Sequence, residues 1–120
     1  MTNAVLIFVA GGCGSVLRYL VGLVVPSALF PWATFGVNAG GSFAIGLFGA
    51  LAARFGWSEG VRLALTVGLC GGFTTFSTFS REALALASSG RWCAFVLYFA
   101  GSAILGIAAA ALGFACVRNA

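Results

Sequence analysis

The chain has 120 residues, of which 62% are hydrophobic and only 7% are charged, and its mean hydropathy is +1.12. A soluble domain carries roughly 25% charged residues on its wet surface. This composition therefore excludes an ordinary soluble domain and indicates an integral membrane protein whose solvent is a lipid bilayer. The net charge of +4 comes from six arginines against two glutamates. The arginines stand singly and form no cluster that could neutralise consecutive phosphates, so we expect no nucleic-acid partner.

Four apolar segments are long enough to cross the hydrocarbon core, which takes about 20 residues in a helix. We expect these spans at residues 4–25, 33–53, 63–87 and 92–117. Pro26 and Pro31 bracket the first turn, and residues 54–62 are expected to form a loop. Short turns leave no room for a soluble domain. The sequence therefore predicts an all-α protein in which residues 1–120 form a single transmembrane domain of four helices.

The third span contains an unusual polar stretch, GLCGGFTTFSTFS, at residues 68–80. Two adjacent glycines followed by two β-branched threonines make a poor helix interior. We expect the third helix to be broken there, near the membrane midplane. A break frees backbone carbonyls, which can hold a cation, and amides, which can face an anion, provided that they line a hydrated cavity. The alternative is an unbroken helix whose hydroxyls bond back to the preceding turn.

Asn38 is the only carboxamide inside an apolar span. It forms a polar stripe with Thr34 and Ser42, because residues four apart share one face of a helix. A buried carboxamide without partners is costly. Asn38 is therefore expected either to bond another helix or to contact a passing ion.

Phe76 and Phe79 are three residues apart, which places them on the same side of the distal half of the third helix. In membrane helices such rings most often face lipid or pack in the core. The alternative is that the positive edge of a phenyl ring meets an anion without carrying a formal charge. Neutral hydroxyl donors are interleaved with these rings at Ser77, Thr78 and Ser80.

Arg18 lies about two-thirds of the way along the first span, where an arginine normally faces an aqueous cavity or a polar partner. It either snorkels to an interface or raises the local anion concentration at a vestibule. Arg81 and Glu82, near the end of the third span, are expected at the interface. No carboxylate is expected at mid-depth, which argues against a proton-coupled exporter.

These stretches resemble the Fluc (CrcB) family of fluoride ion channels over nearly the whole chain. The matching segments are GGCGSVLRY in the first span, ATFGVNAGGSFAIG in the second and GLCGGFTTFSTFS in the third. The resemblance implies an antiparallel, dual-topology homodimer with two fluoride pathways and a central sodium ion. The weak bias of arginines between the two ends of the helices is compatible with dual topology.

The resemblance also implies roles for individual residues. Asn38 corresponds to the family's pore asparagine, and Phe76 and Phe79 correspond to the phenylalanine pair that lines the fluoride path. The backbone carbonyls of Gly71 and Thr74 correspond to those that hold the sodium ion at the dimer interface. The remaining pathway residues implied are Arg18 near the vestibule, Thr34, the hydroxyl track of Ser77, Thr78 and Ser80, and Tyr98 beside the pore.

The expected function is a passive, fluoride-selective channel, not an enzyme, in the bacterial inner membrane. It would export fluoride from the cytoplasm down its electrochemical gradient, with sodium as a fixed structural charge. Two other classes remain as alternatives: a small multidrug-type exporter, and a non-conducting assembly subunit whose polar groups only join helices.

Overall fold

The protein is described by a computed structural model that covers residues 1–118. These residues contain four helical segments long and apolar enough to cross a membrane. In chain order the elements are α1 (Thr2–Val24), α2 (Trp32–Phe55), α3 (Glu59–Leu63), the π-helix η1 (Ala64–Cys70), α4 (Gly71–Phe73), α5 (Ser77–Ser88) and α6 (Trp92–Arg118). The third segment, Glu59–Ser88, comprises α3 to α5 and bends between α4 and α5. The predicted four-span, all-α architecture and the interruption of the third span are confirmed.

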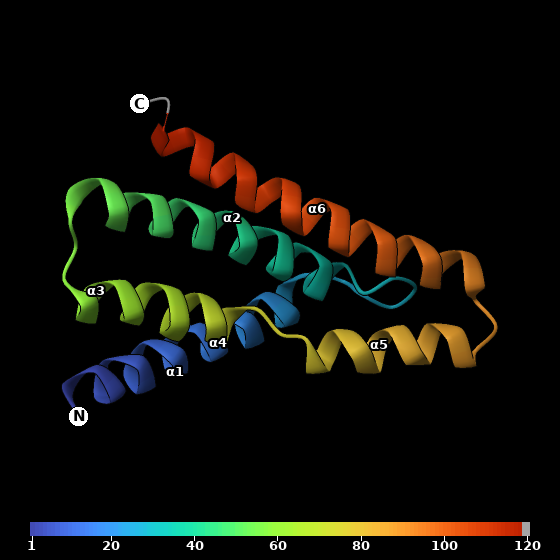
Figure 1. Cartoon of the computed structure of the whole chain (residues 1–120). Coiled ribbons are helices and arrows are strands. Elements are labelled where there is room, and N and C mark those ends of the chain that lie inside the picture. The colour runs from blue at the N-terminus through green and yellow to red at the C-terminus, as the bar shows by residue number, and fades with distance from the viewer. Residues whose placement is uncertain (119–120) are drawn as a thin grey trace.

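The helices form two pairs (Figure 1). The first half of the third span lies along α1, while α2 lies along α6 and runs in the same direction. After the bend, α5 leaves α1 and packs against α6. Helix α1 begins and α6 ends at the same end of the molecule, as four crossings require. The third span therefore joins the two helix pairs, and its bend lies where it passes from one pair to the other.

The connection between the second and third spans is shorter than the predicted loop. Helix α2 continues to Phe55, and Gly56 ends it in the left-handed conformation, with φ of 62°. The Ser58 hydroxyl then accepts a hydrogen bond from the Val61 amide at 3.3 Å, which caps α3 at its N-terminus. The prediction of a loop through Arg62 is wrong, because serine capping starts the helix at Glu59.

The interruption of the third span begins two residues after the second of the adjacent glycines. Gly71 and Gly72 are helical, and the chain first becomes extended at Thr74, with φ of −85° and ψ of 160°. The Thr74 amide and hydroxyl both donate to the Cys70 carbonyl, each at 2.9 Å. The threonine side chain thus closes the last turn of α4, and the break follows in residues 74–76.

The glycines of the third span serve close packing against α1. A Cβ at Gly72 would overlap the Gly11 carbonyl, and one at Gly14 would overlap the Leu69 carbonyl and the Phe73 amide. Small residues let membrane helices approach in this way, since van der Waals contact replaces the hydrophobic effect between helices in lipid. This contact fixes α4, and therefore the start of the break, against α1.

We expect Gly14→Ala to destabilise the protein by about 1–3 kcal/mol, since overpacking against backbone atoms cannot be relieved by rotating a side chain. Gly12→Ala is the matched control, because no atom lies within 4 Å of a Cβ at Gly12. Thermal unfolding of the detergent-solubilised protein measures both variants. Equal unfolding temperatures for the two would contradict the packing role of Gly14.

Candidate functional site

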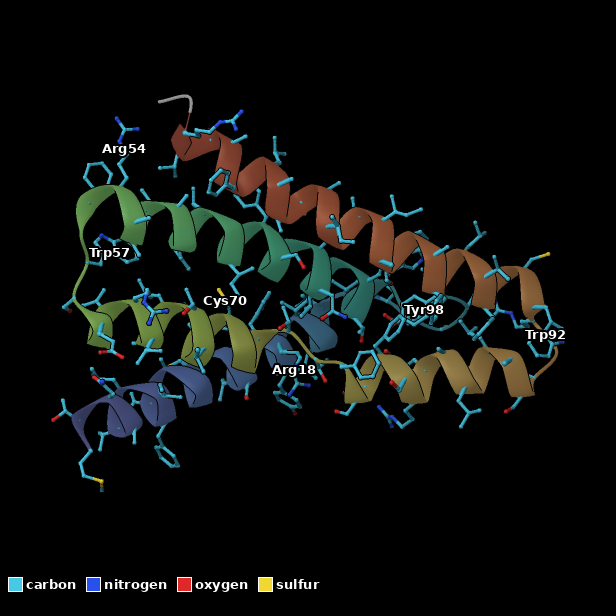
Figure 2. The ribbon with its side chains drawn as sticks, in the orientation of Figure 1. Arg18, Arg54, Trp57, Cys70, Trp92 and Tyr98 are labelled. Atoms are coloured by element: carbon cyan, nitrogen blue, oxygen red, sulfur yellow. The ribbon has the colours of Figure 1, made fainter. Side chains whose placement is uncertain are left out.

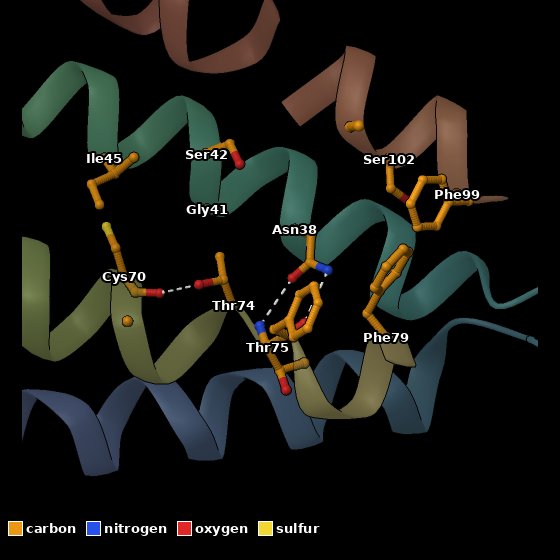
Figure 3. Close-up of a pocket in the computed structure, with 13 residues that line it drawn as sticks. Asn38, Gly41, Ser42, Ile45, Cys70, Thr74, Thr75, Phe79, Phe99 and Ser102 are labelled. Carbon is orange, nitrogen blue, oxygen red and sulfur yellow. Dashed lines mark hydrogen bonds between the residues drawn. The ribbon is translucent and has the colours of Figure 1, made fainter. Parts of the chain in front are cut away.

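A cavity of about 550 Å³ lies beside the break, between α2, the third span and α6 (Figure 3). Its wall combines small, hydroxyl-bearing and aromatic residues. They are Asn38, Gly41, Ser42, Ile45, Cys70, Gly71, Thr74, Thr75, Phe76, Phe79, Phe99, Ser102 and Ala103. Five of the residues predicted to contact ions (Asn38, Gly71, Thr74, Phe76 and Phe79) are therefore gathered around one space.

The Asn38 carboxamide is bound to the backbone at the break. Its Nδ2 donates to the Thr75 carbonyl at 3.2 Å, and its Oδ1 accepts from the Thr75 amide at 3.0 Å (Figure 3). A carboxamide nitrogen carries two hydrogens, and the bond to Thr75 uses one. The second can be offered to a ligand in the cavity that Asn38 lines. The two roles considered for Asn38, joining helices and contacting an ion, are thus compatible in one side chain.

The two phenylalanines lie side by side at the cavity, with ring centroids 5.9 Å apart. Phe79 is buried and packs against Tyr98, whose ring centroid is 4.8 Å away. Phe76 is 78% exposed, so this chain alone does not cover it. One ring is therefore fixed by packing within the chain, and the other lies on a surface that lipid or another chain must cover.

The three interleaved hydroxyl residues do not line the cavity in this chain. Ser77 and Ser80 are exposed. The Ser77 hydroxyl lies 3.3 Å from the Thr75 hydroxyl, which also accepts a hydrogen bond from the Thr78 amide at 3.3 Å. Thr75 thereby caps the first turn of α5. The structure separates this hydroxyl track from the residues that converge on the cavity.

Arg18 lies near the middle of the molecule (Figure 2) and lines a second cavity of about 340 Å³, together with Thr34 and Glu82. Its Nε is 3.5 Å from the Gly72 carbonyl, and the Ser15 hydroxyl lies at the same distance from that carbonyl. Both contacts are long, but the positive charge faces the carbonyl end of α4, where it is favourable. Of the two alternatives for Arg18, this position favours a vestibule over a snorkelling anchor.

Glu82 is turned toward the interior of the protein. The fully buried Tyr98 hydroxyl donates to Glu82 Oε1 at 3.1 Å, and Glu82 shares the second cavity with Arg18. The interfacial position of Glu82 stays a prediction, but the sequence did not indicate that a buried tyrosine on α6 is its partner. Thr34 also interacts with the Tyr98 hydroxyl. Of the two predicted pathway residues, Thr34 therefore lines this second cavity, whereas Tyr98 lines neither cavity and is linked to the second one through Glu82.

Ser102 is a candidate that the sequence analysis missed. Within residues 1–118 its hydroxyl is the one buried side-chain polar atom without a hydrogen-bond partner, and it lines the first cavity. A buried hydroxyl without a partner costs free energy. Ser102 follows Tyr98 by four residues, so both lie on one face of α6. That spacing is the sequence signal that could have found it.

The donor set near the break suits a hard cation. No group of three or more His, Cys, Asp or Glu side chains occurs in the described part of the chain, so a cation there would need backbone or hydroxyl oxygens. Gly71 and Thr74 both line the cavity beside the break. Carbonyls at unwound helices coordinate sodium in membrane proteins, so these residues fit the sodium ion that the family resemblance implies.

Comparison with known proteins identifies the family of this chain. The family model for CrcB-like protein, Camphor Resistance (CrcB), matches residues 5–114. A protein of Phocaeicola vulgatus named "Fluoride-specific ion channel FluC" is 49% identical over 116 residues, covering 94% of this chain and 96% of the relative. Proteins of the same name from Bacteroides fragilis and Novosphingobium aromaticivorans are 44% and 41% identical, and each comparison covers at least 94% of both chains. The chain therefore belongs to the CrcB-like family.

Proposed function

We propose that this protein is a passive, fluoride-selective channel, a multi-pass protein of the bacterial inner membrane that lets fluoride leave the cytoplasm down its electrochemical gradient. The observation that carries the proposal is the convergence of the Asn38 amide with the rings of Phe76 and Phe79 on one cavity beside the helix break. Relatives named as fluoride-specific channels match the chain over nearly its full length. The protein is not an enzyme, since conduction makes and breaks no covalent bond.

The lining of the cavity suits a small, strongly hydrated anion. A narrow path must replace the water around fluoride with closely spaced donors, yet must bind the ion weakly enough to release it. An amide and the positive rims of phenyl rings provide such contacts without a formal charge. A buried lysine would instead hold the anion in a deep electrostatic well.

The second cavity forms the entrance of the proposed pathway. Arg18 attracts anions to this vestibule, and Thr34 and the Tyr98 hydroxyl connect it to the aromatic residues beside the first cavity. Because Tyr98 packs on Phe79, an ion leaving the vestibule meets the aromatic pair next. The Ser77, Thr78 and Ser80 hydroxyls would extend the track on a surface that one chain leaves open.

The working assembly is an antiparallel, dual-topology homodimer. The exposed Phe76 ring supports this proposal, because a second copy would cover it and complete the wall of the pathway. Gly36 and Gly40 add support: they are four apart on α2, and no atom of the chain lies within 4 Å of a Cβ at either position. Such small faces favour close approach of a helix from another chain.

A sodium ion at the dimer interface would be held by the backbone carbonyls of Gly71 and Thr74. When bound, it would supply a fixed positive charge between the two copies. The chain's own contribution is to present two oxygens at the end of α4 and to keep this turn in place against α1. The ion is structural in this proposal and is not transported.

A flux assay on liposomes tests the proposed function. Purified protein is reconstituted in potassium-loaded vesicles, and a potassium ionophore is added while external fluoride and chloride are measured. We expect rapid fluoride efflux with chloride retained. Transport that requires a proton gradient would instead identify an exporter. Absence of fluoride flux from a folded, dimeric protein would identify a non-conducting subunit.

A further inference from the structure

We propose that Asn38 and Thr75 are positioning residues for the cation site. Their side chains accept hydrogen bonds from the two backbone amides that would otherwise donate to the Gly71 and Thr74 carbonyls. Both carbonyls therefore stay available to a cation. This inference rests on the sodium ion of the proposed function and adds the residues that make its site possible.

The first amide belongs to Thr75. In an α-helix each carbonyl accepts from the amide four residues later, so the Gly71 carbonyl would normally accept from Thr75. The Thr75 amide donates instead to Asn38 Oδ1 on α2, at 3.0 Å. The same carboxamide donates to the Thr75 carbonyl, which fixes the orientation of this peptide from both sides. A side chain from another helix has thus replaced the helical acceptor.

The second amide belongs to Thr78. Its helical acceptor would be the Thr74 carbonyl, but it donates to the Thr75 hydroxyl at 3.3 Å. Thr74 is also extended, with ψ of 160°, so its carbonyl does not point along the helix axis as it would in an unbroken helix. Thr75 therefore takes part in both replacements. Its amide bonds Asn38 instead of the Gly71 carbonyl, and its hydroxyl accepts from the Thr78 amide in place of the Thr74 carbonyl.

Two neighbouring carbonyls of the same turn, in contrast, have donors within this chain. The Cys70 carbonyl accepts from both the amide and the hydroxyl of Thr74, and the Gly72 carbonyl faces Ser15 and Arg18. At Gly71 and Thr74, both of which line the first cavity, the amide that would be the helical donor bonds a side chain instead. An unbonded carbonyl away from water costs free energy, and a bound cation offsets that cost.

The arrangement couples the two ion sites through Asn38. Its oxygen holds the Thr75 amide away from the Gly71 carbonyl, while its nitrogen lies on the wall of the proposed fluoride path. Thr75 lines the same cavity, so the effect of changing its side chain on the cation site is measured through the response to sodium and not through fluoride flux.

The decisive variant is Thr75→Val, which keeps the shape of the side chain but removes the hydroxyl acceptor. The Thr78 amide can then return to the Thr74 carbonyl. Thr66→Val is the matched control: Thr66 lies in the same span, and its hydroxyl donates to the Arg62 carbonyl within its own helix. The measured quantity is the sodium concentration that half-maximally raises the thermal unfolding temperature of the purified dimer, with potassium as the ionic-strength control.

We expect Thr75→Val to raise this sodium concentration about fivefold, because a competing hydrogen bond contributes about 1 kcal/mol net. Thr66→Val should leave it unchanged. Hydrogen exchange at the Thr78 amide should show protection in Thr75→Val that no longer responds to sodium. This second readout reports on the backbone even if the variant is less stable.

Three outcomes overturn the inference. Thr75→Val can respond to sodium as the unsubstituted protein does, both valine variants can lose the response equally, or the unsubstituted protein can show no response to sodium. The last result also removes sodium from the proposed function. Fluoride efflux from the unsubstituted protein, measured separately, still decides whether the channel proposal stands.

Discussion

Asn38→Asp is expected to lower fluoride flux at least about 100-fold. In the variant, one carboxylate oxygen can still accept from the Thr75 amide. The other oxygen replaces the Asn38 Nδ2, which in the unsubstituted protein donates to the Thr75 carbonyl at 3.2 Å, so two acceptors would face each other. The carboxylate also places a negative charge on the wall of the cavity. Two like charges about 4 Å apart repel by about 4 kcal/mol at an effective dielectric constant of 20, and each 1.4 kcal/mol corresponds to a factor of ten.

The matched control for this variant is Asn3→Asp, the same substitution near the start of α1 and away from both cavities. Its fluoride flux should equal that of the unsubstituted protein in the same liposome assay. Size-exclusion chromatography of both variants separates loss of conduction from loss of the fold. Normal flux through folded Asn38→Asp would show that fluoride does not pass this side chain.

Phe76→Ile is expected to lower fluoride flux about tenfold or more while leaving the protein folded. The ring is 78% exposed in the single chain, so its removal leaves no cavity in the core of that chain. What it removes is the positive edge of the ring, which can face an anion without a formal charge. Initial rates of efflux, normalised to the amount of dimeric protein in the vesicles, measure the effect.

Phe114→Ile provides the comparison, since Phe114 is also exposed, on α6, but lines neither cavity. It should retain full flux. If the two isoleucine variants conduct alike, Phe76 is only a packing or lipid-facing residue. The non-conducting subunit considered from the sequence would behave in that way.

The sequence predicted the four helices well because lipid imposes a simple rule on length and composition. It predicted the interruption of the third span within the stretch of two glycines and two threonines, and the structure has it at the threonines, in residues 74–76. Gly71 and Gly72 weaken a helix in isolation, yet both are helical here, and Gly72 packs closely against Gly11 of α1. The π-helix at Ala64–Cys70 was not expected either, since no residue type in it demands the wider turn.

The candidate site could be predicted only in part. Asn38, Phe76 and Phe79 stand out in the sequence because an amide and interleaved rings are unusual in an apolar span, and they do line one cavity. Glu82 and Ser102 were not recognised, because their importance depends on partners or space supplied by α6. Which contacts fluoride makes stays a prediction for the flux measurements.

The passage of the third span between two helix pairs has a mechanical consequence. Its first half is tied to α1 by backbone contacts at Gly14 and Gly72, and its second half is tied to α6 through Tyr98. A shift of one pair against the other would therefore be absorbed by the dihedral angles of residues 74–76. Because these three residues also line the first cavity, such a shift would change the spacing of the oxygens and the ring that they contribute to its wall.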